Sequence, residues 1–410
     1  MRRPPADEAR GDAGAPRRTR IGAAGASIIA RDGERAAPPA GAGAAPAPQP
    51  TPQPTPEPAP GGLVELGPAD FARWDDFVER HPDGWICHLS DWLRTLEESF
   101  PHITGRVLAS ERDGALRAGI PVCEVRSRVL GTRLVSVPYG TLCCPLAPDD
   151  EVGRLMEGVL DLGRRAGARC IEVRAVRPLS AAAAERFARQ ARYTHHSLDV
   201  TAGAEALRLR LHRSCVRQRI DRALARGVVD EEAQDEGGLR AFYDLYVRCR
   251  KRLGLPPQPY RFIRSMWLAF RPQGRLEVRL ASCRGTPIAG ILLLRFNGRT
   301  SAEYLVSDDG RRHESPGHLL VWNAIRRSHE LGCRVFDFGR TDAANEGLMA
   351  FKNRWGAQVT GLPVYYHPKS RLQAVESRRA ALRSAGRVVF RRLPARANRW
   401  LGELIYRHAG

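Results

Sequence analysis

The order of the expected helices and strands constrains the fold most strongly, because the same order occurs twice along the chain. From Gly62 onward, hydrophobic spacing and turn residues predict two helices, three strands, a helix, a strand, a helix and a last strand. Asp113-Gly114 separates the first two strands and is typical of a hairpin turn. The other expected elements are helices at Ala69–Arg80, Ser90–Phe100, Asp150–Ala166 and Ser180–Arg192, and strands at Cys170–Ala175 and near Ser197.

The second part of the chain repeats this order, with hairpin signals at Arg284-Gly285 and Asn297-Gly298. Its expected helices are Ser214–Arg226, Leu239–Leu253, Gly317–Leu331 and Gly347–Trp355, and its expected strands are Leu276–Ser282, Ile288–Phe296, Thr300–Ser307, Arg334–Phe338 and Leu362–Tyr366. An antiparallel meander followed by β-α-β is one α/β unit. Two units in one order predict an α/β (α+β) protein with mixed sheets and internal duplication, although generic α/β alternation is an alternative explanation.

The composition points to an anionic partner and a reducing compartment. The formal net charge is +20, which suits nucleic acid, a phosphate-rich substrate or an anionic membrane surface. The 9 cysteines form no C-x-x-C pair and lie mostly in apolar runs, as expected for reduced thiols in the cytoplasm. The sequence contains no apolar run near the roughly 20 residues of a membrane helix and no signal-peptide pattern.

Composition changes near both ends of the chain divide it into four expected segments. Residues 1–62 form a tail rich in Ala, Pro and Arg that we expect to be disordered. Two domains are expected over residues 63–202 and 203–368, followed by a basic helical extension over 369–410 that Pro394 divides in two. The apolar stripe of this extension predicts either contact with an anionic membrane or ordinary docking on the second domain.

The segment Phe336–Arg340 is the strongest candidate for a functional site. A strand with alternating Phe ends in Asp337, a glycine and Arg340, and ligands bind at the carboxyl ends of strands in α/β sheets. Lys352 follows on a short helix, in a chain that has only three lysines. We predict that Lys352, with Arg340, stabilises an oxyanion and that Asp337 orients Arg340; a buried ion pair and a solvated lysine are the structural alternatives.

This region resembles the Fem family of aminoacyl transferases. The resemblance is carried by FDFGRTDAANEGLMAFKNRWGA at 336–357, RCRKRLGLPPQPYRFI at 248–263 and LHRSCVRQRIDRALARGV at 211–228. The end of the chain, FRRLPARANRWLGELIYRHAG, is similar to a Fem-related subgroup linked to exosortase and exopolysaccharide loci. The resemblance implies tandem GNAT-like domains, attack of an amine on an activated acyl group, and Phe351 and Lys352 beside the reaction centre.

Further residues are candidates for substrate contacts. The resemblance places Trp355 in the F-K-x-x-W-G motif, and His318 lies in a turn before a helix that could cradle phosphate. Arg219 and Arg222 share one face of a basic helix, which suits a polyanion or a solvated surface. Tyr304 and Glu303 lie on the last meander strand, where either could polarise or deprotonate an amine; for Glu303 an ordinary sheet role is favoured.

The sequence therefore predicts an N-acyl or aminoacyl transferase that acts on an amine of an anionic cell-envelope or exopolysaccharide precursor. Its expected location is cytoplasmic, with peripheral contact at the inner face of the membrane as an alternative. No metal, DNA or permanently bound cofactor is expected, and the acyl donor is either aminoacyl-tRNA or acyl-CoA. The alternatives are an acyl-CoA-dependent GNAT N-acetyltransferase and a catalytically inactive scaffold of a polysaccharide assembly complex.

Overall fold

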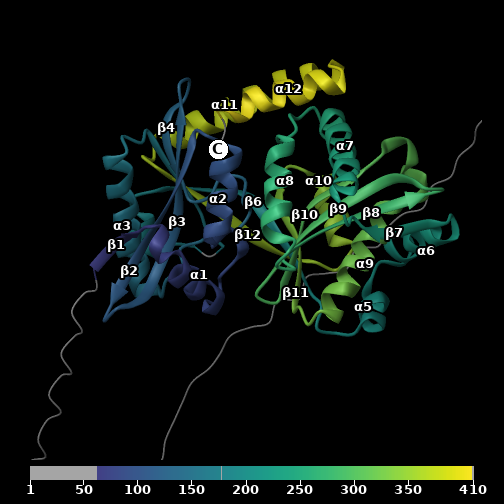
Figure 1. Ribbon diagram of the computed structural model, residues 1–410, viewed down its shortest axis with the longest axis horizontal. Coiled ribbons are helices and arrows are strands. Elements are labelled where there is room, and N and C mark those ends of the chain that lie inside the picture. Colours follow the sequence, from purple (N-terminus) through teal and green to yellow (C-terminus); the bar gives the residue numbers. More distant parts are fainter. Residues whose placement is uncertain (1–61, 177, 409–410) are drawn as a thin grey trace, which may run out of the picture. The chain divides into compact units, whose positions relative to one another are not determined.

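The computed structural model describes residues 62–176 and 178–408 (Figure 1). The predicted tail therefore lies outside the described residues, except for Gly62, which begins the first strand. Elements of the first half are β1 (Gly62–Leu66), α1 (Phe71–Arg80), α2 (Ser90–Ser99), β2 (Ile103–Arg112), β3 (Ala115–Ser127), β4 (Gly131–Val135), α3 (Asp149–Arg165), β5 (Cys170–Arg174), α4 (Ala181–Ala184) and β6 (Ala188–Asp199).

The second half continues directly from β6. Its elements are α5 (Ala204–Arg210), α6 (Gln218–Ala225), β7 (Val228–Glu232), α7 (Glu236–Leu253), α8 (Tyr260–Phe270), β8 (Leu276–Cys283), β9 (Thr286–Phe296), β10 (Arg299–Ser307), α9 (Pro316–Glu330), β11 (Val335–Asp342), α10 (Glu346–Asn353), β12 (Gln358–His367), α11 (Arg371–Arg392) and α12 (Ala395–Tyr406). All three predicted hairpin turns form, with both central residues at positive φ.

One sheet of 12 strands joins the two halves, in the order β1-β2-β3-β4-β5-β12-β6-β11-β10-β9-β8-β7. Strands β1 to β6 of the first half correspond in turn to β7 to β12 of the second half. If each strand is exchanged for its counterpart, the order of the sheet is the same when read from its other edge, which confirms the predicted repeat. β6, the last strand of the first half, pairs with β11 of the second half, and β12, the last strand of the second half, pairs with β5 of the first. Each half therefore contributes its last strand to the other. The exchanged strands also pair with each other at the centre.

The prediction of a helix at Ser180–Arg192 is wrong. Only Ala181–Ala184 is helical, and the chain from Ala188 onward is strand β6. Alanine has the highest helix propensity, but tertiary pairing overrides it here: Ala188 and Gln190 lie in register with Tyr366 and Val364 of β12. The short strands β1 and β7 and the helix α8 were not predicted.

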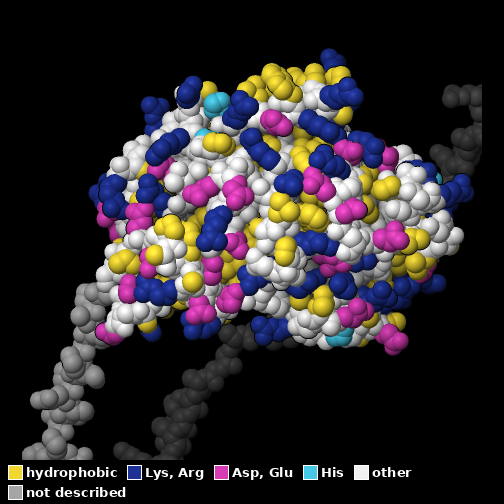
Figure 2. All heavy atoms as spheres, viewed as in Figure 1, with side chains coloured by type: hydrophobic (Ala, Val, Ile, Leu, Met, Phe, Trp, Pro, Cys, Tyr) yellow, Lys and Arg dark blue, Asp and Glu magenta, His cyan; other side chains and the backbone are white. Residues whose placement is uncertain are grey.

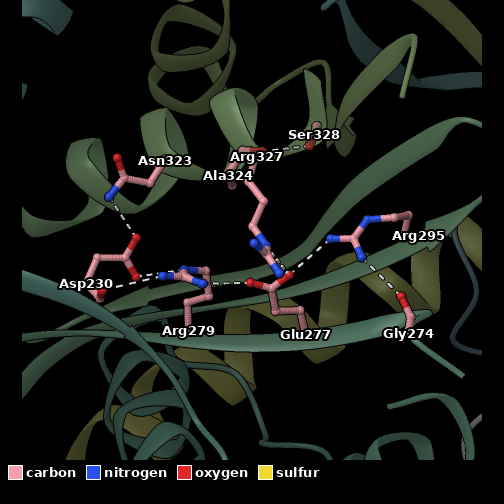
Figure 3. A network of polar contacts seen from close by, with 9 residues as sticks. All are labelled: Asp230, Gly274, Glu277, Arg279, Arg295, Asn323, Ala324, Arg327 and Ser328. Atoms are coloured by element: carbon pink, nitrogen blue, oxygen red, sulfur yellow. Dashed lines mark hydrogen bonds and ion pairs between the residues drawn. The ribbon is translucent and has the colours of Figure 1, made fainter. Parts of the chain in front are cut away.

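A polar network fastens α9 to the sheet (Figure 3). Glu277 on β8 is buried and accepts hydrogen bonds from Arg279, Arg295 and Arg327 at 2.7, 3.0 and 3.0 Å. Asp230 on β7 accepts from Arg279 and Asn323, both at 2.8 Å. Arg327 and Asn323 lie on α9, so the network fixes this helix against β7, β8 and β9.

Candidate functional site

A cavity of 380 Å³ opens where the parallel strands β10 and β11 part. They pair only from Arg299 to Ser301 and from Val335 to Asp337. Beyond that point both strands carry a bulge, with Glu303 as the extra residue on β10 and Phe338 as the extra residue on β11. The cavity is lined by Tyr139, Thr141, Tyr246, Arg250, Gln258, Ala302, Glu303, Tyr304, Phe338, Gly339, Arg340 and Tyr406.

Glu303 is the ionisable group best placed for acid–base chemistry in this cavity. Its carboxylate accepts hydrogen bonds from Ser301 Oγ at 2.8 Å and from Thr141 Oγ1 at 3.5 Å. Burial raises the pKa of Glu303 to about 7, the nearby Asp337 carboxylate adds to the rise, and the two hydroxyl groups oppose it. A carboxylate with this pKa can accept a proton near neutral pH.

Asp337 and Lys352 both bind the backbone of Gly339, the residue that follows the bulge in β11. Asp337 Oδ1 accepts from the Gly339 amide at 2.6 Å, and Lys352 Nζ donates to the Gly339 carbonyl at 2.8 Å. Gly339 has a φ of +73°, which disfavours a side chain there. Both charged residues are buried and neither lines the cavity, so they shape its wall rather than fill it.

The surroundings of these two residues shift their pKa values. Burial by itself raises the pKa of Asp337, but His195 and Arg299 lower it overall; their nitrogens lie 2.7 and 3.4 Å from Oδ2. Burial lowers the pKa of Lys352 to about 8, against the opposing effect of Asp337 and Glu303. The sequence predicted that Asp337 orients Arg340; in the structure the Arg340 guanidinium lies over the Tyr193 ring, 4.5 Å from its centre.

Tyr304, predicted as a substrate contact, belongs to a tyrosine cluster in the cavity wall. Its hydroxyl donates to Gln258 Oε1 at 2.6 Å, and Tyr246 donates to the same oxygen at 3.2 Å. The rings of Tyr304 and Tyr246 meet edge to face at 5.4 Å. Arg250 lies beside them with its guanidinium 5.8 Å from the Tyr246 ring centre.

The cavity draws residues from both halves and from the last helix. Tyr139 and Thr141 follow β4 in the first half, while Tyr406 ends α12. The rings of Tyr139 and Tyr406 lie 5.4 Å apart, and burial raises the pKa of Tyr406 to about 12. Through Tyr406, α12 therefore contacts residues of both halves and completes the cavity.

The remaining predicted residues form a second group, outside the cavity lining. His318 packs against Phe351 and Trp355, with ring centres 5.6 and 6.0 Å away. Burial and the nearby Arg219 lower the pKa of His318 to about 4. Arg219 and Arg222 are exposed on α6, and this helix contacts α9, which carries His318 in its first turn.

The pseudo-equivalent opening in the first half is closed by Arg174 at the end of β5. Its guanidinium donates to the carbonyls of Val137 and Gly140 at 2.7 and 2.6 Å and pairs with Glu172 at 3.0 Å. The side chain is buried. Arg174 therefore occupies the position in the first half that corresponds to the cavity of the second half.

The described ranges 62–176 and 178–408 contain neither a candidate metal site nor a candidate membrane-spanning helix. There, no group of three or more His, Cys, Asp or Glu side chains is arranged to hold a metal ion. No helix in these ranges combines the length and apolar character that a bilayer-spanning segment requires.

Comparisons with known proteins agree with the topology. Residues 210–353 match the family described as acetyltransferase (GNAT) domain. A crystal structure of FemX is 16% identical, with a TM-score of 0.60 over 74% of this chain and 96% of its own. A tandem GNAT protein of the clavulanic acid biosynthesis pathway is 16% identical, with a TM-score of 0.48 over 74% of this chain and 97% of its own.

No curated protein matches the chain by sequence. The repeated strand order and the FemX likeness confirm the predicted tandem GNAT-like fold. The family match over residues 210–353, together with this fold, supports an acyl or aminoacyl transferase.

Proposed function

We propose that the chain transfers an activated acyl or aminoacyl group to an amine in the cavity between β10 and β11, with Glu303 as the general base. The observation that carries the proposal is the position of Glu303: a carboxylate with its pKa raised to about 7, on a bulge, in a cavity that both halves line. An attacking amine must lose a proton, and a base with a pKa near the working pH removes it effectively.

The proposed step is a single acyl transfer. The amine gives a proton to Glu303, its nitrogen forms a bond to the acyl carbon, and the bond from that carbon to the sulfur or oxygen of the donor breaks. The leaving group takes up a proton. Arg340 lines the cavity and is the candidate that stabilises the oxyanion of the tetrahedral intermediate. Lys352 acts through its bond to the Gly339 carbonyl, as a positioning residue.

The donor carries phosphate in either candidate form. The GNAT family match supports acyl-CoA, while the resemblance to Fem proteins supports aminoacyl-tRNA. The first turn of α9, with His318 and the nearby Arg219, is the proposed contact for the donor phosphates, because helix N-termini attract anions. The exposed Arg222 on α6 would extend this contact.

The proposed acceptor is an amine of an anionic envelope or exopolysaccharide precursor. Arg250 and Arg340 give the cavity two cationic groups beside Glu303, which suits a substrate that carries an amine and an acid. Resemblance to the exosortase-linked subgroup supports the same substrate class. An inactive scaffold is less well supported, because such a protein has no need for a cavity at the parted strands.

The test is product analysis by mass spectrometry. Full-length protein is incubated with acetyl-CoA or with a mixture of aminoacyl-tRNAs, each with a panel of acidic amino sugars and amino acids. We expect N-acylated product with one donor and its loss in Glu303→Gln. The control Glu231→Gln, an exposed carboxylate on β7, should keep the activity. Equal product formation by Glu303→Gln and the control would refute the role of Glu303.

A further inference from the structure

The outer face of α12 carries an apolar pair between arginines. Trp400 and Leu404 are 67% and 39% exposed and lie one helical turn apart. Arg396 and Arg407 are exposed one turn before and about one turn after this pair. A tryptophan exposed to this extent leaves a large apolar area in water.

The opposite face of α12 is already occupied by the protein. Asn398 is fully buried and donates to the Phe390 carbonyl at 2.9 Å. Gly402 lies so close to Pro257 that an added Cβ would come within 2.5 Å of its carbonyl oxygen. Because these contacts fix the rotation of α12, Trp400 and Leu404 point away from the core.

The end of α11 extends the same kind of surface. Val388 and Val389 are 53% and 47% exposed, and Arg391 and Arg392 follow them directly. Figure 2 shows hydrophobic side chains on the outer edge of the α11–α12 band, bordered by Lys and Arg. From residue 386 to 408, six arginines accompany a single acidic residue, Glu403. Apolar side chains within a strongly basic border match the chemistry of an anionic lipid surface.

We propose that this outer face, made of Val388, Val389, Trp400 and Leu404 with Arg392, Arg396 and Arg407, docks on an anionic lipid bilayer. Trp400 and Leu404 would enter the interface between water and lipid, where tryptophan is enriched. The arginines would meet the lipid phosphates, so binding falls as salt rises. The proposal is independent of the transfer reaction, because it requires no donor, no acceptor and no turnover.

The experiment is vesicle co-sedimentation of the full-length protein at low salt. The vesicles are phosphatidylcholine alone or phosphatidylcholine mixed with phosphatidylglycerol. We expect the protein to pellet with the mixed vesicles only, and the variant Trp400→Ser/Leu404→Ser to bind about tenfold more weakly or worse, since two interfacial apolar side chains are lost. A control variant, Val129→Ser/Leu209→Ser, removes side chains that are 71% and 73% exposed elsewhere and should bind like the wild type.

Point substitutions are preferable to deletion, because α12 also supplies Tyr406 to the cavity. Melting temperatures of both variants confirm that they fold. If the wild type does not bind the mixed vesicles, or if Trp400→Ser/Leu404→Ser binds them as well as the control variant does, the docking proposal is wrong. A change in oligomeric state confined to the Trp400 variant, without vesicle binding by the wild type, would also overturn it in favour of a protein partner.

Discussion

At the scale of single residues, Glu303 and Asp337 share one electrostatic environment. The Asp337 charge is among the causes that raise the pKa of Glu303, after burial itself. Asp337→Asn removes this charge, so the pKa of Glu303 falls. The acid limb of the profile of kcat/KM against pH should then move to lower pH, whatever the change in maximal rate.

The measurement is that profile for the wild type, Asp337→Asn and the control Asp113→Asn. Asp113 is exposed in a hairpin turn, where asparagine is equally favourable. An acid limb that stays in place in Asp337→Asn would show that the two carboxylates do not interact.

The buried Lys352 makes a prediction about stability. Its pKa is about 8 in the folded protein against the ordinary lysine value of 10.5, so folding disfavours the charged form at neutral pH. The cost is roughly 3 kcal/mol below pH 8, and it disappears as pH rises towards 10.5, because the unfolded chain then binds more protons than the folded chain.

Lys352→Met removes this cost together with the bond to Gly339. We expect transfer to fall sharply, while the free energy of unfolding at pH 7 stays equal to that of the wild type or exceeds it. Denaturant titrations between pH 7 and pH 10 should show the stability advantage of the variant shrinking as pH rises. A constant difference across this range would mean that Lys352 titrates normally.

At the scale of elements, the bulge at Gly339 is the feature most sensitive to a small substitution. Gly339→Ala places a Cβ at positive φ, which costs roughly 1–2 kcal/mol, and the new methyl group lies 3.7 Å from the carbonyl oxygen of Ala302, which lines the cavity. Gly356→Ala is the matched control, since its φ is +78° and its surroundings are open. We expect similar losses of stability in both variants but a loss of kcat/KM in Gly339→Ala alone. If both variants have the same kcat/KM, the shape of the bulge does not matter for catalysis.

The polar network beneath α9 makes a second prediction at this scale (Figure 3). Glu277→Gln leaves three arginines without their shared carboxylate and should lower the free energy of unfolding by about 3 kcal/mol. Although burial opposes it, the arginines lower the pKa of Glu277 overall. The Glu277 carboxylate therefore contributes to the free energy of unfolding fully above pH 4.5, and this contribution is lost as the pH falls through the lower pKa of Glu277 in the folded protein. Urea titration of the wild type and Glu277→Gln at pH 7 and at acid pH tests both statements.

Local sequence patterns predicted most elements, because hairpin turns and hydrophobic spacing act over a few residues. Pro394 was rightly predicted to divide the C-terminal helices. The patterns did not predict Glu303 as the leading base, because its place depends on a bulge that periodicity cannot reveal. Tyr406 and Tyr139 were missed for a related reason: they reach the cavity through tertiary docking, far from the motif in sequence.

At the scale of the whole molecule, the exchange of β6 and β12 makes the two halves depend on each other. Such pairing joins segments more than 150 residues apart, so no local signal could have predicted it. The repeated topology places two related pairs of parallel strands in the sheet, and Arg174 occupies the end of the first pair. The first half now contributes Tyr139 and Thr141 to the cavity of the second.

The central claim is that Glu303 accepts the proton of the acceptor amine in the cavity of the second half. The most direct measurement is kcat/KM of wild type, Glu303→Gln and Glu231→Gln across pH 5–9, once a substrate pair is known. The account predicts that wild type and Glu231→Gln share an acid limb near pH 7, set by the raised pKa of Glu303. It predicts a loss of about 10²- to 10⁴-fold in Glu303→Gln. A Glu303→Gln enzyme that keeps both the rate and the acid limb would contradict the account.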